Sequence, residues 1–140
     1  MAEVSLEDYD AVFGLNVRAL YVVTQAVVRR MLAGGAKGSI INISSQMGHV
    51  GGPNRTLYCG SKHAVEGITK ALAVELAPKG IRVNSIAPTF IETAMTRPYF
   101  AVPGFKDSVL SKIALGRLGQ VDDVMGAVAY LASDLSALVT

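Results

Sequence analysis

Apolar side chains recur at helical spacing through the first third of the chain and predict one amphipathic helix over residues 6–32. The positions that share its apolar face are Val12, Leu15, Ala19, Val22, Val23, Ala26, Val27 and Met31. Ser5 is a suitable N-cap, and Asp8, three residues further on, can complete a capping arrangement. A glycine-rich stretch at 34–38 ends the helix.

Two short β-branched runs alternate with two further helices. Residues 39–44 and 81–87 predict buried strands, and Pro88 closes the second. Helices are expected over 57–77 and over 121–132. The resulting α-β-α-β-α order implies right-handed crossovers and a parallel sheet, so we expect an α/β fold.

Residues 89–118 have no regular period and are interrupted by proline and glycine. They predict short helices in a mobile insert that covers a site. Two strands and three long helices do not make a stable sheet fold, because the helices bury more surface than two strands can cover. We therefore expect either a fragment of a longer protein or a chain that needs other segments to fold.

The composition fits a single domain over residues 1–140. Hydrophobic residues are 51% and charged residues 17%, which excludes a disordered chain, and a scattered net charge of +2 does not suggest a nucleic-acid surface. No apolar run reaches the ~18 residues of a membrane span, and the acidic N-terminus is unlike a signal peptide. Cys59 is the only cysteine, which suits a reducing cytoplasm. No histidine or carboxylate cluster suggests a metal site.

Tyr58 and Lys62 lie four residues apart, on one face of the predicted helix. A free phenol has a pKa near ~10, too high for efficient proton transfer at neutral pH. A neighbouring ammonium favours the phenolate, because opposite charge stabilises the ionised form. The pair is therefore a candidate acid/base unit, although a core aromatic beside a solvated lysine would give the same spacing.

Ser45 follows the first predicted strand, thirteen residues before Tyr58. At a strand end its hydroxyl can hold a substrate oxygen, although Ser44 and Ser45 also suit an ordinary turn. Asn16 falls within the predicted helix 6–32, where its side chain competes with backbone hydrogen bonds. It is either a surface polar residue or one kept for a function.

Six segments combine into a larger pattern: 16–19, 41–45, 58–62, 82–88, 116–119 and 130–134. In this order and spacing they resemble the C-terminal catalytic portion of a short-chain dehydrogenase/reductase. The resemblance covers almost the whole chain and implies part of a Rossmann-like, doubly wound parallel sheet. The xylulose and polyol reductase type is somewhat similar, and the β-ketoacyl reductase type shares most of the same landmarks.

The resemblance implies hydride transfer between NAD or NADP and a small carbonyl or alcohol substrate. Tyr58 is implied as the general acid/base, and Lys62 as the residue that lowers the phenol pKa and binds the nicotinamide ribose. Ser45 would hold the substrate oxygen. Asn16 would hold a water that links the lysine to solvent.

Further positions match contacts of the family. Pro88, Thr89, Ile91 and Thr93 correspond to the nicotinamide end of the cofactor site, with Thr89 where relatives often have glycine. Thr93 also suits the N-cap of a short helix. Candidates to line the substrate pocket flank Ser45 or lie in the insert: Gln46, Met47, His49 and Tyr99.

The family's glycine-rich phosphate loop has no counterpart in this sequence. The residue that separates NAD from NADP is missing as well, so binding of either cofactor by this chain alone is in doubt. A second hypothesis is a truncated, inactive fragment that acts as an oligomerisation or interaction module. In relatives, the helices matching 6–32 and 57–77 form subunit interfaces, so the resemblance implies a homodimer or homotetramer.

Overall fold

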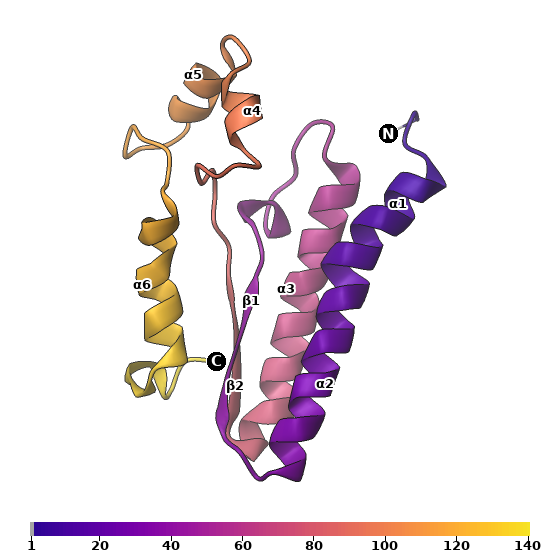
Figure 1. The fold of residues 1–140 in the computed structure, drawn as a ribbon, viewed down its shortest axis with the longest axis vertical. Coiled ribbons are helices and arrows are strands. Elements are labelled where there is room, and N and C mark those ends of the chain that lie inside the picture. Colours follow the sequence, from indigo (N-terminus) through magenta and orange to yellow (C-terminus); the bar gives the residue numbers. More distant parts are fainter. Residues whose placement is uncertain (1) are drawn as a thin grey trace.

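Two parallel strands form the centre of the molecule, as the order of elements predicted. The computed structural model describes residues 2–140, in which β1 (Gly38–Ile43) pairs with β2 (Ile81–Ile86). Gly38 lies opposite Ile81 and Ile43 opposite Ile86, so both strands end at the same edge. Helices cover both faces of the pair, which confirms the α/β class (Figure 1).

The helix predicted over 6–32 is present as a continuous helical run, with one change inside it. The run consists of α1 (Leu6–Phe13), a π-helical turn (Gly14–Ala19) and α2 (Leu20–Ala33). The expected cap is confirmed, because the Ser5 hydroxyl accepts a hydrogen bond from the Asp8 amide at 3.0 Å. Pi-helical turns are frequent at functional sites, and this one contains Asn16.

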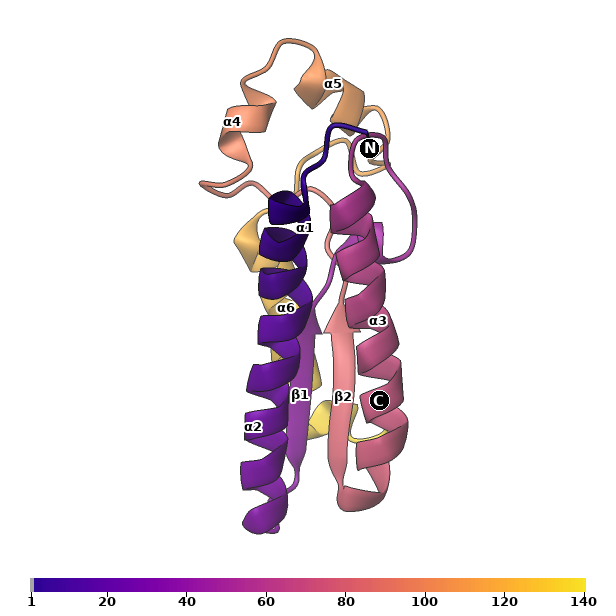
Figure 2. The same ribbon diagram turned by 90° about the vertical axis from the view of Figure 1, so that its right-hand side faces the viewer.

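Helix α3 (Thr56–Leu76) lies beside this run on the same face of the sheet (Figure 2). The buried core between them consists of Leu76, Ile81 and Val83, against which these partly buried side chains pack: Val28, Met31, Ile40, Leu72 and Ala73. A short turn (Ala77–Lys79) joins α3 to β2 through Gly80. Gly80 has a φ of 73°, and a Cβ there would lie 2.9 Å from the Lys37 side chain, so the position favours glycine.

Helix α6 (Val121–Ala132) covers the opposite face of the sheet (Figure 1). The Ser39 hydroxyl donates to the Leu131 carbonyl at 2.8 Å, and the Arg82 guanidinium donates to the same carbonyl at 2.9 Å. The Val83 amide donates to the Thr140 hydroxyl at 2.9 Å. These polar contacts fix α6 and the C-terminal residues against the strands.

The segment between β2 and α6 lies beyond the ends of the strands (Figure 1). It contains two short helices, α4 (Arg97–Phe100) and α5 (Phe105–Leu110), and a parallel bridge between Ile91 and Gly119 closes its base. Its aromatic rings pack together, with the Phe90 and Phe105 centroids 6.0 Å apart. The short helices match the expectation for 89–118, while movement of this segment stays a prediction.

The helical run exposes much of its apolar surface: Leu15 is 73% and Val23 62% accessible. By length and composition Leu6–Ala33 could cross a membrane, with a mean hydropathy of 1.5 over its most apolar window. This corrects the expectation that no stretch is long and apolar enough. The finding is weak, because core helices of soluble proteins pass the same test, and α2 packs on the sheet through Val28 and Met31.

Candidate active site

The loops that leave the two strands are joined directly by hydrogen bonds. The Ser44 amide donates to the Ile86 carbonyl at 2.8 Å, and the Gln46 amide donates to the Pro88 carbonyl at 2.9 Å. The Thr89 hydroxyl then donates to the Gln46 side-chain oxygen at 2.8 Å. Parallel pairing therefore continues past the strands and brings residues 45–46 beside residues 88–89.

Ser45 and Ser44 point to different surroundings, which separates the two candidate serines. Ser45 is in extended conformation and lines a pocket, and its hydroxyl accepts from the Met47 amide at 3.1 Å. The Ser45 hydroxyl proton is thus free to be donated into the pocket. Ser44 is 4% exposed and does not line this pocket; a Cβ on Gly48 would lie 2.8 Å from its hydroxyl oxygen.

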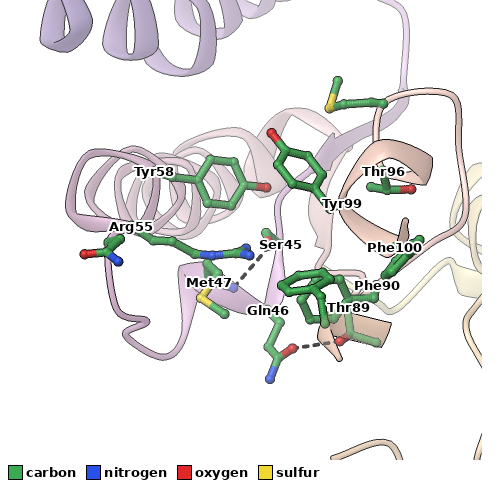
Figure 3. Close-up of a pocket in the computed structure, with 13 residues that line it drawn as sticks. Ser45, Gln46, Met47, Arg55, Tyr58, Thr89, Phe90, Thr96, Tyr99 and Phe100 are labelled. Atoms are coloured by element: carbon green, nitrogen blue, oxygen red, sulfur yellow. Dashed lines mark hydrogen bonds between the residues drawn. The ribbon is translucent and has the colours of Figure 1, made fainter. Parts of the chain in front are cut away.

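Helix α3 carries Tyr58 and Lys62 to the same end of the strands. Tyr58 lies in the first turn of α3 and lines the pocket with Ser45 (Figure 3). The Lys62 Nζ donates to the Ile43 carbonyl, the last of β1, at 3.0 Å and lies 5.8 Å from the centroid of the Tyr58 ring. Burial lowers the pKa of the Lys62 ammonium from its ordinary value.

Asn16 reaches this cluster indirectly, from the π-helical turn. Its Nδ2 donates to the Ser61 hydroxyl at 3.0 Å, and that hydroxyl donates to the Tyr58 carbonyl at 2.8 Å. Asn16 and Lys62 also line one hollow of about 420 Å³ beside β1. Sequence reasoning did not identify Ser61, which is fully buried and fixes Asn16 against α3.

The pocket in front of Ser45 and Tyr58 has a volume of about 470 Å³. The loop after β1, the start of α3 and the segment after β2 line it with Ser45, Gln46, Met47, Asn54, Arg55, Tyr58, Thr89, Phe90, Met95, Thr96, Tyr99, Phe100 and Phe105. Gln46, Met47 and Tyr99 are therefore where the sequence predicted them. Arg55 and the phenylalanines were missed, because nothing in the local sequence brings 54–55 and 90–105 together.

Of the other predicted site residues, Thr89 lines this pocket, while Pro88, Ile91, Thr93 and His49 do not. Pro88, Thr89 and Ile91 line a second hollow of about 440 Å³, so Thr89 borders both spaces. Thr93 instead bonds to Thr96, whose hydroxyl accepts from the Thr93 amide at 2.8 Å. The sequence predicted that His49 lines this pocket, but it does not, because its imidazole turns to the Glu66 carboxylate.

Glu66 is a buried carboxylate that sequence reasoning missed. It is 5% exposed on α3, one turn after Lys62, and accepts from the Ser85 hydroxyl at 2.8 Å. The His49 Nε2 lies 3.4 Å from its other oxygen, and the Ser44 hydroxyl is close but outside good hydrogen-bond geometry. Burial raises the pKa of this carboxyl, but the serine hydroxyls and nearby positive charge outweigh it and lower the pKa overall.

A strand-end serine, a Tyr-x-x-x-Lys pair on the following helix and a parallel α/β sheet define one class of protein. The chain belongs to the short-chain dehydrogenase/reductase family. Residues 1–140 match the family model described as enoyl-(acyl carrier protein) reductase.

Individual relatives cover nearly all of this chain. It is 41% identical to L-xylulose reductase of Bos taurus over 138 residues, which are 99% of this chain and 57% of that protein. It is 46% identical to 3-oxoacyl-[acyl-carrier-protein] reductase of Thermotoga maritima, over 96% of this chain and 53% of the relative.

A solved structure from Agrobacterium tumefaciens with bound NADP, described as a 2-deoxy-d-gluconate 3-dehydrogenase, is also similar. It is 40% identical with a TM-score of 0.96, and the match covers 99% of this chain and 56% of that one. The chain thus spans about half the length of the relatives it matches.

Proposed function

We propose that the protein carrying these residues is an NAD(P)-dependent oxidoreductase that interconverts a secondary alcohol and a ketone. The observation that carries this proposal is the meeting of Ser45, Tyr58 and Lys62 where two parallel strands end. Open parallel sheets bind their ligands outside the carboxyl ends of the strands. The three relatives described above carry the names of reductases or dehydrogenases, which supports the same class of reaction.

In ketone reduction, the Tyr58 hydroxyl gives its proton to the carbonyl oxygen. The Ser45 hydroxyl donates a hydrogen bond to the same oxygen and holds it beside the phenol as negative charge develops there. The hydride that the carbonyl carbon receives comes from the nicotinamide cofactor when it is bound. In alcohol oxidation, Tyr58 accepts the proton instead.

Lys62 supplies positive charge beside the phenol. One of its ammonium hydrogens is used by the Ile43 carbonyl, which fixes the side chain against the end of β1. The remaining hydrogens are available to the nicotinamide ribose and to water. Because burial lowers its pKa, Lys62 releases a proton more readily than an exposed lysine.

The residues fit the nicotinamide end of NAD or NADP. Pro88, Thr89 and Ile91 line a mainly apolar hollow beside the strand ends, and Lys62 offers donors at the same edge. No glycine-rich loop for the phosphates occurs in the sequence. We therefore propose that residues 1–140 alone bind either cofactor weakly, and that Thr93 contributes only through the fold of its segment.

A proton route to Tyr58 through Lys62 follows from the placement of Asn16. The Asn16 amide nitrogen is occupied by Ser61, which leaves its side-chain oxygen for water. The hollow of about 420 Å³ that Asn16 and Lys62 share has room for several waters. Such waters would connect the lysine with solvent and restore the phenol proton after each turnover.

An assembly role is the second candidate, favoured by the exposed apolar residues of the helical run. Between this run and α3 lies a groove of about 640 Å³ lined mainly by apolar side chains, Phe13 and Ile68 among them. A second copy covering the run and α3 would give a homodimer, and a homotetramer would need a further contact between two such dimers. Light scattering tests this, and a strict monomer at working concentration would count against it.

Tyr58→Phe in the complete gene product tests the catalytic proposal. Removing one hydroxyl should lower the ketone reduction rate at least ~10²-fold, because general acid catalysis contributes about that much. Tyr130→Phe is the matched control, since Tyr130 lies on α6 and does not line the pocket. A Tyr58→Phe enzyme that keeps its rate would refute the assignment.

A further inference from the structure

Among residues 2–140, Arg55 is the one charged residue that lines the pocket of about 470 Å³ in front of Ser45 and Tyr58. Its side chain extends into the pocket beneath Tyr58 (Figure 3). No aspartate or glutamate lines this space, and no carboxylate of residues 2–140 forms an ion pair with Arg55. A guanidinium cannot lose its charge in a protein, so the pocket keeps one uncompensated positive charge.

The guanidinium is held in place rather than free to swing into solvent. The guanidinium carbon lies over the Phe90 ring, 5.6 Å from the ring centroid, in a cation–π contact. Such a contact forms no N–H hydrogen bond, so the N–H groups stay available, and their geometry matches a carboxylate or phosphate. The preceding residue, Asn54, has a φ of 57°, so the chain turns sharply at the point that directs Arg55 inward.

The start of α3 adds positive potential at the same place. Arg55 is the residue before α3, its side chain forms no capping hydrogen bond, and no acidic residue lies in the first turn. Both α1 and α6 have a capping box and acidic first turns. The positive end of a helix of 21 residues therefore adds to the charge of Arg55 instead of being neutralised.

We infer that the substrate of this site is an anionic ketone or alcohol, whose carboxylate or phosphate Arg55 binds while Ser45 and Tyr58 hold the reacting oxygen. The inference rests on the proposed function, because it takes Tyr58 as the reacting end of the pocket. The side-chain NH₂ of Gln46, which also lines the pocket, is left free by the bond to Thr89 and can donate to a substrate hydroxyl.

The first experiment compares ketones that differ only in charge. Methyl ketones of graded length, ending in a carboxylate, in a phosphate monoester or in the neutral methyl ester, are reduced by the complete gene product with NADPH and NADH. Charge-assisted hydrogen bonds of this kind correspond to about 10- to 100-fold in KM. We expect the anions to have the lower KM, and the carboxylate and phosphate series identify which anion is preferred.

Arg55→Met keeps an unbranched apolar side chain beside Phe90, although a shorter one, and removes the guanidinium with its charge. It should raise the KM of the anions about 10- to 100-fold and leave the KM of the esters unchanged, while Arg55→Lys should recover part of the difference. If the Arg55–Phe90 contact has a purely structural role, Arg55→Met should raise the KM of anions and esters equally. Equal KM values in the unmodified enzyme, or a preference that survives Arg55→Met, would overturn the inference.

An equilibrium measurement separates this inference from the catalytic proposal. In a Tyr58→Phe background, calorimetric titration with the same oxo acids and esters measures binding without turnover. If Arg55→Gln is added to the Tyr58→Phe variant and oxo-acid binding is lost, the anion site is supported even when the protein reduces no ketone. Unchanged binding of a folded double variant, checked by circular dichroism, contradicts it.

Discussion

Glu66→Gln should destabilise the protein at neutral pH and make its stability less sensitive to acid. The carboxylate is buried on α3 and accepts a hydrogen bond from Ser85 of β2, while Ser44 and His49 lie close to it after β1. Glutamine has nearly the same shape and can still accept from Ser85. The charge is removed and one carboxylate oxygen becomes an NH₂ group, so the variant tests chiefly the electrostatic part of the contact.

The magnitude follows from the kind of hydrogen bond that is lost. A bond to a charged group contributes about 1.5–3 kcal/mol and a neutral one about 0.5–1.5 kcal/mol, so Glu66→Gln should cost about 1 kcal/mol. Glu66→Ala also leaves the half-buried Ser85 hydroxyl without its acceptor and opens a cavity. That variant should cost about 3 kcal/mol or more.

The pH dependence has a definite sign. The pKa of Glu66 in the folded protein lies below its ordinary value of 4.5, because the serine hydroxyls and the charges of His49 and Lys70 outweigh burial. Its stabilisation is therefore complete above that ordinary value and is lost as pH falls through the folded-state pKa. The gap in unfolding free energy between the unmodified protein and Glu66→Gln should narrow below pH ~4.5.

Urea unfolding of the complete gene product at a series of pH values measures this gap. Glu75→Gln is the matched control, since Glu75 is an exposed glutamate on the same helix and its change should be nearly neutral. Two outcomes would refute the reasoning: a Glu66→Gln protein as stable as the unmodified one at pH 7, or a gap that widens in acid.

Three further outcomes test the surroundings of the site. Asn16→Ala should cost about 1 kcal/mol in urea unfolding, because the buried Ser61 hydroxyl loses its donor; no change would mean that the bond is replaced by water. Gly48→Ala should cost about 1–3 kcal/mol, since its Cβ would lie 3.0 Å from both the Glu66 side chain and the Lys62 carbonyl; a neutral result would show that the loop moves freely. Competitive acetylation should give Lys62 a midpoint below its ordinary pKa of 10.5, because burial disfavours the ammonium; a midpoint at or above that value would contradict this.

Local signals in the sequence predicted the elements and the reacting residues well. Helical spacing and the Ser5 cap located the first helix within a residue or two of its structural bounds, and the β-branched runs located both strands. Tyr58 and Lys62 were recognisable because a period of about four residues holds them on one helix face. The π-helical turn was not predictable, since apolar spacing does not distinguish it from an ordinary helical turn.

Local sequence patterns could not predict the contacts between segments that are distant in the sequence. Glu66 looks like a solvated charge in sequence, and only the meeting of α3 with Ser85 and His49 makes it a buried acceptor. His49 was predicted to line the pocket because it follows Ser45 closely, but this contact draws it away. Arg55 became a candidate only once Phe90, thirty-five residues later, was seen beneath its guanidinium.

In the part of the chain that the structure describes, the outer edge of β1 has no neighbouring strand, and the candidate site lies beside a large solvent-exposed surface for this reason. The accessible surface is 9249 Å², whereas a compact monomer of 14.7 kDa has about 6,900 Å². Among residues 2–140, β1 pairs only with β2, and Ile43 is 50% exposed at its end. Further strands pairing along β1 would cover both the edge and the apolar side of the helical run. The Ile43 carbonyl also accepts the hydrogen bond from Lys62, so this edge of β1 adjoins the site. A strand that paired with β1 at this edge would therefore lie next to Lys62.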